Sequence, residues 1–273
     1  MDNAKRTSLL AAAKNIRLGI LEGVHAAKSG HPGGSLSIAD LMAYLYKEEL
    51  NVRADDPTWA DRDRFVLSKG HTAPALYATL AEFGFIPRED LKTLRKADSY
   101  LQGHPDMKHT PGVDMSSGSL GLGISTACGM ALAGKIDKKD YRVYTIVGDG
   151  ESEEGQVWEA AMFASHYKLD NLCVILDLNG LQIDGPITEV MNPMPHDEKY
   201  RAFGFHVIVI DGHDFDAIEA AFAEAKTVKG KPTAIIAKTV KGKGVSFMEN
   251  QVGWHGKAPS DEQYEAAIAE LNA

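Results

Sequence analysis

Four short apolar segments, separated by helical patterns, constrain the fold of this chain most strongly. They are rich in β-branched residues and lie at residues 143–147, 172–176, 206–210 and 233–237. Apolar runs of this length are typical of strands buried on both faces of a sheet. Helical periodicity occupies residues 155–167, 197–203 and 215–227 between them. The alternation predicts an α/β fold, namely a doubly wound parallel sheet with helices on both faces.

The rest of the sequence predicts further elements of one domain. Helical spacing of apolar residues covers residues 8–28, 37–49 and 74–83, and residues 64–67 are a candidate strand. Residues 100–120 are rich in Gly, Pro, Ser and His, and they predict a long loop of the kind that is often functional. Ser260 and Gln263 form a capping box before a last helix. Because no repeat or linker is found, we expect residues 1–273 to form a single domain.

The charge balance and the cysteines exclude several classes of protein. Lys plus Arg number 29 against 38 Asp plus Glu, a net charge of −9, which offers no general field for nucleic acid or an anionic membrane. Cys128 and Cys173 both lie in apolar stretches, so neither a disulfide framework nor a zinc site is expected. No apolar run approaches the roughly 20 residues of a membrane span, and no signal peptide pattern is present. We therefore expect a cytoplasmic protein.

The strongest chemical signal is Gly148-Asp149-Gly150, directly after the second candidate strand. Asn179 follows the next strand. Since ligands bind at the carboxyl ends of parallel strands, Asp149 and Asn179 are candidate oxygen ligands of one Mg²⁺ ion. The glycines would let the main chain approach a diphosphate, and a helix beginning near Gly155 would point its N–H groups at it. On its own, however, Gly-Asp-Gly is equally a common turn.

Additional motifs carry a resemblance to a known family. Gly148-Asp149-Gly150, Glu154-Gly155 and Asn179 resemble the thiamine-diphosphate signature, although Leu178 replaces the polar residue that often precedes the asparagine. Further blocks resemble transketolases and occur in transketolase order: 29–33 (SGHPG), 61–71 (DRDRFVLSKGH), 103–105 (GHP), 118–121 (GSLG) and 254–256 (WHG). The chain is similar to the N-terminal, thiamine-diphosphate-binding part of a transketolase over nearly its whole length.

This resemblance implies a role for particular residues. Asp149, Asn179 and the main-chain carbonyl of Leu181 would hold Mg²⁺ or Ca²⁺. The residues that would contact thiamine diphosphate are His71, Gly118, Leu120, Asp149, Gly150, Asn179, Ile183 and His255. The catalytic histidines implied by the resemblance are His31, His71, His104 and His255, which would transfer protons near the thiazolium carbon. Imidazole suits this task at neutral pH, because its ordinary pKa is near 6.5.

Two other motifs are weaker candidates. Gly212-His213-Asp214 precedes a helix and is interpreted as a turn, with Asp214 as the N-cap. Lys241-Gly242-Lys243-Gly244 could touch phosphate but lacks the Walker spacing. It could equally be a flexible, solvated turn, and it is left out of the predicted site.

The resemblance also implies that a second chain completes the enzyme. A whole transketolase carries two further domains, and the pyrimidine-binding one supplies the glutamate that activates the cofactor. Glu154 does not replace it, because the resemblance puts Glu154 at the contact between subunits. The implied partner is a C-terminal transketolase subunit with the pyrimidine-binding and C-terminal domains, in an α₂β₂ assembly. The implied reaction transfers a two-carbon ketol unit from a ketose phosphate to an aldose phosphate, as in the pentose phosphate pathway.

Alternatives stay open at this point. The chain could act on another substrate, such as a sulfo-sugar, a branched sugar or formaldehyde, or resemble 1-deoxyxylulose-5-phosphate synthase, which the blocks at 29–33 and 254–256 fit less well. It could also be a non-catalytic scaffold subunit, against which the intact Asp149 and Asn179 argue.

Overall fold

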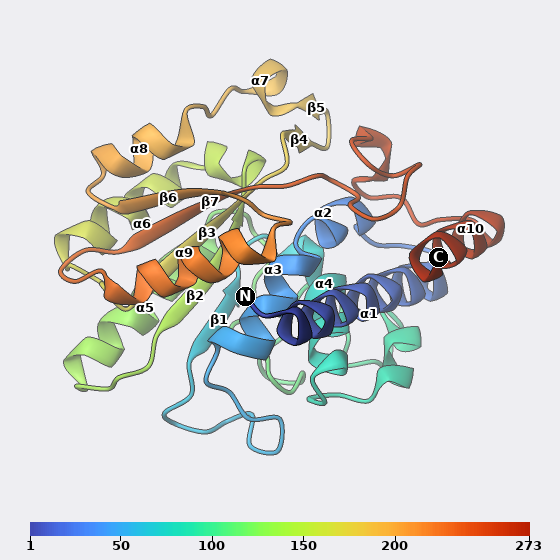
Figure 1. The fold of residues 1–273 in the computed structure, drawn as a ribbon, viewed down its shortest axis with the longest axis horizontal. Helices are drawn as coiled ribbons and strands as arrows, with labels where there is room; N and C mark the ends of the chain where they lie inside the picture. Colours follow the sequence, from blue (N-terminus) through green and yellow to red (C-terminus); the bar gives the residue numbers. More distant parts are fainter.

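Five parallel strands form the central sheet, in the order β1-β2-β3-β7-β6 (Figure 1). The computed structural model describes residues 1–273. The strands of the sheet are β1 (Arg64–Leu67), β2 (Val143–Gly148), β3 (Leu172–Leu178), β6 (His206–Asp211) and β7 (Thr233–Lys238). All five predicted strands are therefore confirmed, and the later four extend one or two residues beyond their predicted ends. The parallel α/β fold class is confirmed too.

Alternate residues of the inner strands pack into two separate layers, as expected for a sheet covered on both faces. Tyr144 and Ile146 of β2 belong to the larger apolar cluster, whereas Val143 and Val147 belong to the smaller one. The same alternation holds for β3 and β7. The two clusters lie on opposite faces of one sheet and make the chain a single domain.

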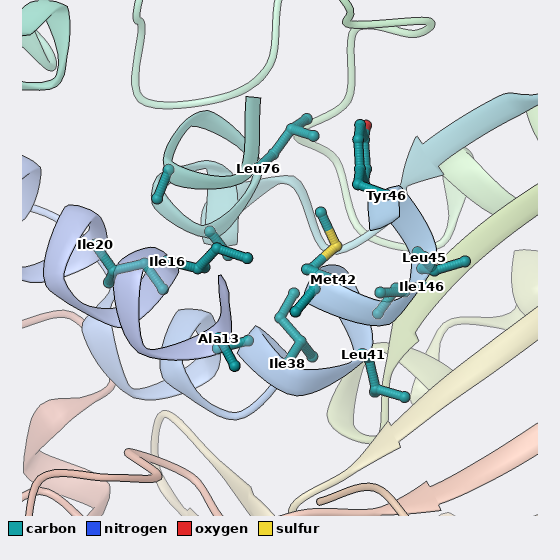
Figure 2. Packing of buried hydrophobic residues seen from close by; sticks show 14 of the residues in the cluster. Ala13, Ile16, Ile20, Ile38, Leu41, Met42, Leu45, Tyr46, Leu76 and Ile146 are labelled. Carbon is teal, nitrogen blue, oxygen red and sulfur yellow. The ribbon is translucent and has the colours of Figure 1, made fainter. Parts of the chain in front are cut away.

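The helices of the first face come mainly from the N-terminal part of the chain. Those with most of the buried side chains are α1 (Asn3–Ala27), α3 (Ala39–Tyr44), α4 (Ala73–Glu82) and α9 (Phe215–Thr227). Figure 2 shows Ile16, Met42 and Leu76 from three of these helices meeting in this layer, near Ile146 of β2. The C-terminal helix α10 (Asp261–Asn272) lies beside α1 at the edge of the molecule (Figure 1).

The second face is covered by α5 (Leu122–Ile136), α6 (Gly155–His166) and α8 (His196–Ala202). Capping agrees with the sequence at two helices. Asp214 caps α9 by accepting from the Asp216 N–H group, and Ser260 and Gln263 form the predicted capping box of α10. At α1, Asp2 caps the helix, so it begins at Asn3, earlier than the predicted residue 8.

The helix predicted for residues 37–49 is confirmed in position, although it begins at Ala39 and its last turn is π-helical: α3 continues directly into η1 (Leu45–Glu49). A short helix that was not predicted, α2 (Pro32–Leu36), precedes it. The break between α2 and α3 falls at Ser37, whose hydroxyl donates to the Gly34 carbonyl and to Asp177 Oδ2, at 3.0 and 2.8 Å. Serine hydroxyls that bond outside the helical ladder favour such breaks.

The connections are short helical turns and loops. The turns are η2 (Gly70–Thr72), η3 (Arg88–Thr93), η4 (Gly150–Glu153) and η5 (Val252–Trp254). The predicted long loop is confirmed, since residues 100–121 contain neither helix nor strand. A small hairpin of β4 (Leu181–Gln182) and β5 (Gly185–Pro186), followed by α7 (Ile187–Val190), was not predicted. No helix has the length and apolar character needed to cross a membrane.

Candidate active site

A cavity opens at the carboxyl ends of β2 and β3, where the sequence places its strongest motif. Gly148 of β2 pairs with Asp177 of β3, so the residues that follow these strands come together. The cavity has a volume of about 320 Å³. It is lined by His31, Gly34, Lys69, His71, Gly118, Leu120, Gly148, Asp149, Gly150, Glu151, Asn179, Leu181, Gln182, Ile183, Lys241 and His255. Of the predicted site residues, only His104 is absent from this lining.

Asp149 is buried and firmly held. Its Oδ1 accepts from the Gly150 N–H group at 2.8 Å, and its Oδ2 accepts from the Gly180 N–H group at 2.5 Å. Burial, reinforced by the nearby Asp177 carboxylate, raises the pKa of Asp149 to about 6. A carboxylate kept in this environment gains from a cation beside it, as a metal ligand does.

Asn179 lies beside Asp149 with its amide group oriented. Its Nδ2 donates to Asp177 Oδ2 at 2.9 Å, while its Oδ1 accepts from the Leu181 N–H group at 3.1 Å. The donor end of the amide is thus occupied by Asp177. The oxygen keeps a free lone pair for a metal ion.

Asp177 itself anchors the floor of the site. It is fully buried and accepts from Lys69 Nζ at 2.6 Å, as well as from Ser37 and Thr239. Burial alone would raise the pKa of Asp177, but the Lys69 ammonium outweighs it and holds the pKa below its usual value. Lys69 is almost completely buried and also donates to the Gly34 carbonyl at 2.8 Å. Lys69 lies within the block at 61–71, but no role was predicted for it.

These residues fit a hard divalent cation bound together with a diphosphate. Asp149, Asn179 and the Leu181 carbonyl supply three oxygen donors at one edge of the cavity. The structure contains no group of three or more His, Cys, Asp or Glu side chains that could hold a metal ion by themselves. A magnesium site with few protein ligands that shares its shell with phosphate oxygens matches this donor set.

Gly150 lets the main chain after β2 approach Gln182 of β4 closely. A Cβ atom on Gly150 would lie 3.0 Å from Gln182 Cβ, closer than side chains normally pack. The lining includes Gly150 and Glu151 of η4 but no residue of α6. α6 begins at Gly155 as predicted, with the turn η4 between it and Asp149. That its N–H groups point at a diphosphate stays a prediction.

Three of the four predicted histidines form one cluster. The ring centroids of His31, His71 and His255 lie 5.2 to 5.6 Å from one another. They come from the N-cap of α2, from the turn η2 and from the end of η5, which are far apart in the sequence. His104 lies behind Gly118, where an added Cβ atom would be 3.4 Å from His104 Cγ.

The clustered histidines are neutral at physiological pH. Burial, followed by the charge of Arg95, lowers the pKa of His31 to about 4. Burial, followed by the charge of Lys241, lowers the pKa of His255 to about 3. Burial also lowers the pKa of His71 well below its usual value. Buried imidazoles next to cations resist protonation.

Neighbouring cations also decide which ring nitrogen carries the proton. Lys241 Nζ lies 3.1 Å from His255 Nδ1, and Arg95 Nη2 lies 3.5 Å from His31 Nδ1. Ammonium and guanidinium groups can only donate hydrogen bonds, so both Nδ1 atoms are acceptors. In each ring the proton is therefore on Nε2, which acts as a hydrogen-bond donor.

Lys241 is the main site residue that sequence reasoning missed. The motif at 241–244 was left out of the predicted site, yet Lys241 is only 2% exposed and lines the cavity. Its Nζ donates to the Leu181 carbonyl at 3.0 Å. Burial, together with the charge of Lys69, lowers the pKa of Lys241 to about 8. The available signal was its position just after β7, the strand next to β3 in the sheet.

Comparison with known proteins identifies the family. Residues 9–271 match the family described as transketolase, thiamine diphosphate binding domain. The chain is 49% identical over 260 residues to the 6-deoxy-6-sulfo-D-fructose transketolase subunit of Clostridium sp. (strain MSTE9), covering 95% of this chain and 94% of that subunit. It is 44% identical over 263 residues to an apulose-4-phosphate transketolase subunit of Phocaeicola vulgatus, covering 96% of this chain and 93% of that one.

Longer transketolases match as well, but only over part of their length. The human transketolase is 45% identical over 271 residues, which are 99% of this chain and 43% of that protein. The crystal structure of transketolase from Campylobacter jejuni superposes with a TM-score of 0.91 and 34% identity, covering 100% of this chain and 43% of that one. The resemblance found in the sequence is confirmed: this chain belongs to the transketolase family, as a thiamine-diphosphate-binding domain.

Proposed function

We propose that this chain is the cofactor-binding subunit of a split transketolase, which transfers a two-carbon ketol unit from a ketose phosphate to an aldose phosphate. One observation carries the proposal: three neutral histidines lie around a cavity that also presents Asp149 and Asn179. Oxygen ligands for a metal–diphosphate unit and proton-transferring groups for a sugar hydroxyl thus meet in one place.

The cofactor and its metal would be held by residues of this chain. Asp149, Asn179 and the Leu181 carbonyl would hold Mg²⁺, or Ca²⁺ in its place. Gly150 and the Lys241 ammonium would contact the diphosphate. Gly118, Leu120 and Ile183 would contact the organic part, and both apolar side chains are exposed, at 37% and 61%. Thiamine diphosphate, when bound, supplies the electron sink for carbon–carbon bond cleavage.

The histidines would then act on the substrate. His31 and His255 would donate hydrogen bonds from Nε2 to a developing alkoxide, and these bonds would weaken again as the carbonyl re-forms. His71 packs against both rings and would contact the cofactor as well as the substrate. His104 stays a predicted channel residue, outside the cavity of this chain alone.

We infer that a partner chain supplies the glutamate that activates the cofactor. Glu151 is the glutamate that lines the cavity, and its carboxylate is already occupied. It accepts from Ser68 Oγ at 2.5 Å and from the Gly121 and Gly148 N–H groups at 2.9 Å each. Such a carboxylate is not free to bind an aminopyrimidine ring. The coverage of 94% of one subunit but 43% of the human enzyme supports a separate chain.

An exposed apolar surface offers a place for that partner. We call it the α5–α6 surface, and its exposed residues are Leu122, Ile136, Met162, Phe163 and Tyr167, between 37% and 69% exposed. α5 carries no charged residue before Lys135. Apolar patches of this kind mark contact sites between proteins. We propose that the partner, with the pyrimidine-binding and C-terminal domains, packs here in an α₂β₂ assembly.

A second substrate class is supported by a specific observation. The relative that is 49% identical is named for a sulfo-sugar, and another relative is named for apulose 4-phosphate, a branched sugar. We propose that residues 1–273 act as one cofactor-binding domain whichever sugar is used.

A cytoplasmic location stays a prediction; Cys128 and Cys173 are both buried free thiols.

The test is to isolate the tagged chain from its source and assay what accompanies it. The expected result is a co-purifying second chain, with transfer from xylulose 5-phosphate to ribose 5-phosphate that needs thiamine diphosphate and Mg²⁺. Activity only with 6-deoxy-6-sulfofructose as the donor would establish the second substrate class instead. Full activity of the single chain, or cofactor-independent transfer, would contradict the proposal.

A further inference from the structure

The segment that carries Lys241 is held from outside the cavity. Lys241 touches two parts of the site, because its Nζ lies 3.0 Å from the Leu181 oxygen and 3.1 Å from His255 Nδ1. The main chain beside it bends at Gly242, with a φ of 80°. The Gly242 N–H group donates to the Gly33 carbonyl at 2.9 Å. A shift of this segment would therefore move the ammonium away from both of its contacts.

His213 contacts this segment directly, one residue before Lys241. The Val240 N–H group donates to His213 Nε2 at 2.9 Å. His213 Nδ1 lies 2.7 Å from Asp40 Oδ2. Because Nε2 accepts, the proton of the neutral ring is on Nδ1 and is donated to Asp40. His213 therefore lies in the turn between β6 and α9 and joins two other parts of the chain. One ring nitrogen binds Asp40 of α3, and the other binds the segment that carries Lys241.

Asp40 is fixed in turn by Arg17 of α1. Arg17 donates to Asp40 Oδ1 and Oδ2 at 3.0 and 2.6 Å, and its Nε donates to the Lys243 carbonyl at 3.0 Å. Both side chains are buried, at 8% and 5% exposed. Bidentate pairs of this kind are geometrically specific. His213 and Arg17 thus hold the main chain by hydrogen bonds at Val240 and at Lys243, on either side of Lys241.

We propose that His213 is a positioning residue that, together with Asp40 and Arg17, holds Lys241 in place to receive the diphosphate of the cofactor. The inference rests on the proposed function, because it assumes that thiamine diphosphate binds in this cavity. The cause is geometric. Residues that orient a ligand-binding group from behind commonly change affinity by about tenfold or more when they are removed.

Two variants separate the contacts of His213. In His213→Asn the short amide can still donate to Asp40, but it is too short to accept from Val240. In His213→Gln the longer side chain places its oxygen near the position of Nε2, so the Val240 contact is retained. Hydrogen–deuterium exchange of residues 239–249 is expected to accelerate in His213→Asn and to stay near wild type in His213→Gln. This measurement needs no cofactor. Equal exchange in all three proteins would overturn the positioning role.

The second measurement is the dissociation constant of thiamine diphosphate with Mg²⁺, by calorimetry on the chain with its partner. We expect about tenfold weaker binding for His213→Asn, near wild-type binding for His213→Gln, and no change for the control His206→Gln on β6. Wild-type affinity of a folded His213→Asn would contradict the inference. Absence of binding by the wild type would instead defeat the proposed function.

A measurement on the wild-type chain covers the case in which His213→Asn fails to fold. The ¹⁵N NMR shifts of the His213 ring are expected to show the proton on Nδ1 and a bare Nε2. A proton on Nε2 would exclude the bond from Val240 and overturn the proposal.

Discussion

In this site one cation next to each of two histidines determines which ring nitrogen carries the proton. Arg95 and Lys241 each approach the Nδ1 atom of one ring and leave Nε2 protonated. Their charges add to burial in keeping the rings neutral. A neutral imidazole that donates a hydrogen bond through Nε2 can stabilise the negative charge of a developing alkoxide. We expect this pair of cation contacts to matter as much for activity as the histidines themselves.

The lowered histidine pKa values predict how stability depends on pH. His255 has a folded pKa of about 3, below the ordinary 6.5 of the unfolded chain, so between these values the unfolded state binds more protons. The free energy of unfolding should therefore fall as pH falls from 6.5 towards 4. His255→Gln removes one contribution and should show a shallower fall, measured by urea denaturation at pH 5 and pH 7.5. Identical pH dependence in both proteins would contradict the low pKa.

Asp149 predicts a second outcome at the same scale. Asp149→Asn keeps the side-chain shape but removes the charge that a metal ion needs. We expect Mg²⁺-dependent binding of thiamine diphosphate to weaken at least about tenfold. The thermal midpoint without metal should stay near that of the wild type, because removing a buried carboxylate beside Asp177 offsets the loss of one of the two main-chain hydrogen bonds that Asp149 accepts. The control is Asp137→Asn, at the exposed C-terminal end of α5; equal loss in both variants would refute the assignment.

The residues that were predicted stand in recognisable family motifs, whereas the residues that were missed have a role only through contacts with distant segments. Asp149, Asn179 and three histidines were predicted from motifs, and the structure brings them together. Lys241 was dismissed, because its burial depends on contacts with Gly33 and His255 that the motif at 241–244 does not reveal. His213 was predicted only as a turn, since its partners Asp40 and Val240 come from other elements.

At the scale of elements, close packing of α5 against β1 connects the sheet to the site. Gly123, in the first turn of α5, lies against Ser68, and a Cβ atom there would be 2.5 Å from Ser68 Cα. Ser68 Oγ donates to Glu151, which in turn binds the Gly121 and Gly148 N–H groups. The beginning of α5 and the end of β2 are thereby held by one carboxylate.

This contact predicts unequal effects of two substitutions in the same helix. Gly123→Ala should lower the free energy of unfolding by about 1–3 kcal/mol, because backbone atoms have to shift. Gly129→Ala meets nothing within 4 Å and should be neutral or raise stability by about 0.5–1 kcal/mol, since alanine favours helix over glycine. Thermal and urea unfolding of the isolated chain measure both. Equal effects would show that this packing is looser than described.

The elements themselves were mostly predictable, and the exceptions have physical causes. Buried strands carry a continuous apolar signal, and capped helices carry end signals at Asp214 and Ser260. The break at Ser37 depends on a bond to Asp177, which is distant in the sequence. The β4–β5 hairpin is too short to show periodicity. Local patterns thus predict elements, whereas long-range bonds decide where they bend.

At the scale of the whole molecule, the cavity and the α5–α6 surface belong to the same side of the chain. Leu120 lines the cavity, and α5 begins just after it, at Leu122. A groove between α5 and α6, of about 320 Å³, is lined by Ser125, Cys128, Gly129, Gln156, Glu159, Ala160 and Phe163. A partner seated on this surface would also reach the open side of the cavity. Assembly and completion of the active site would then be one event.

The last prediction tests that connection. Met162→Glu puts a charge on the exposed part of α6 within the α5–α6 surface, where it would have to be buried without a partner group on assembly. The isolated chain should keep its thermal midpoint, because Met162 is 58% exposed. Light scattering with the partner chain should show loss of the large complex, together with loss of transfer activity. Leu10→Glu, at a 55% exposed position of α1, is the matched control and should assemble normally. If Met162→Glu assembles as well as Leu10→Glu does, the partner binds another surface. Assembly then does not depend on the α5–α6 surface beside the cavity.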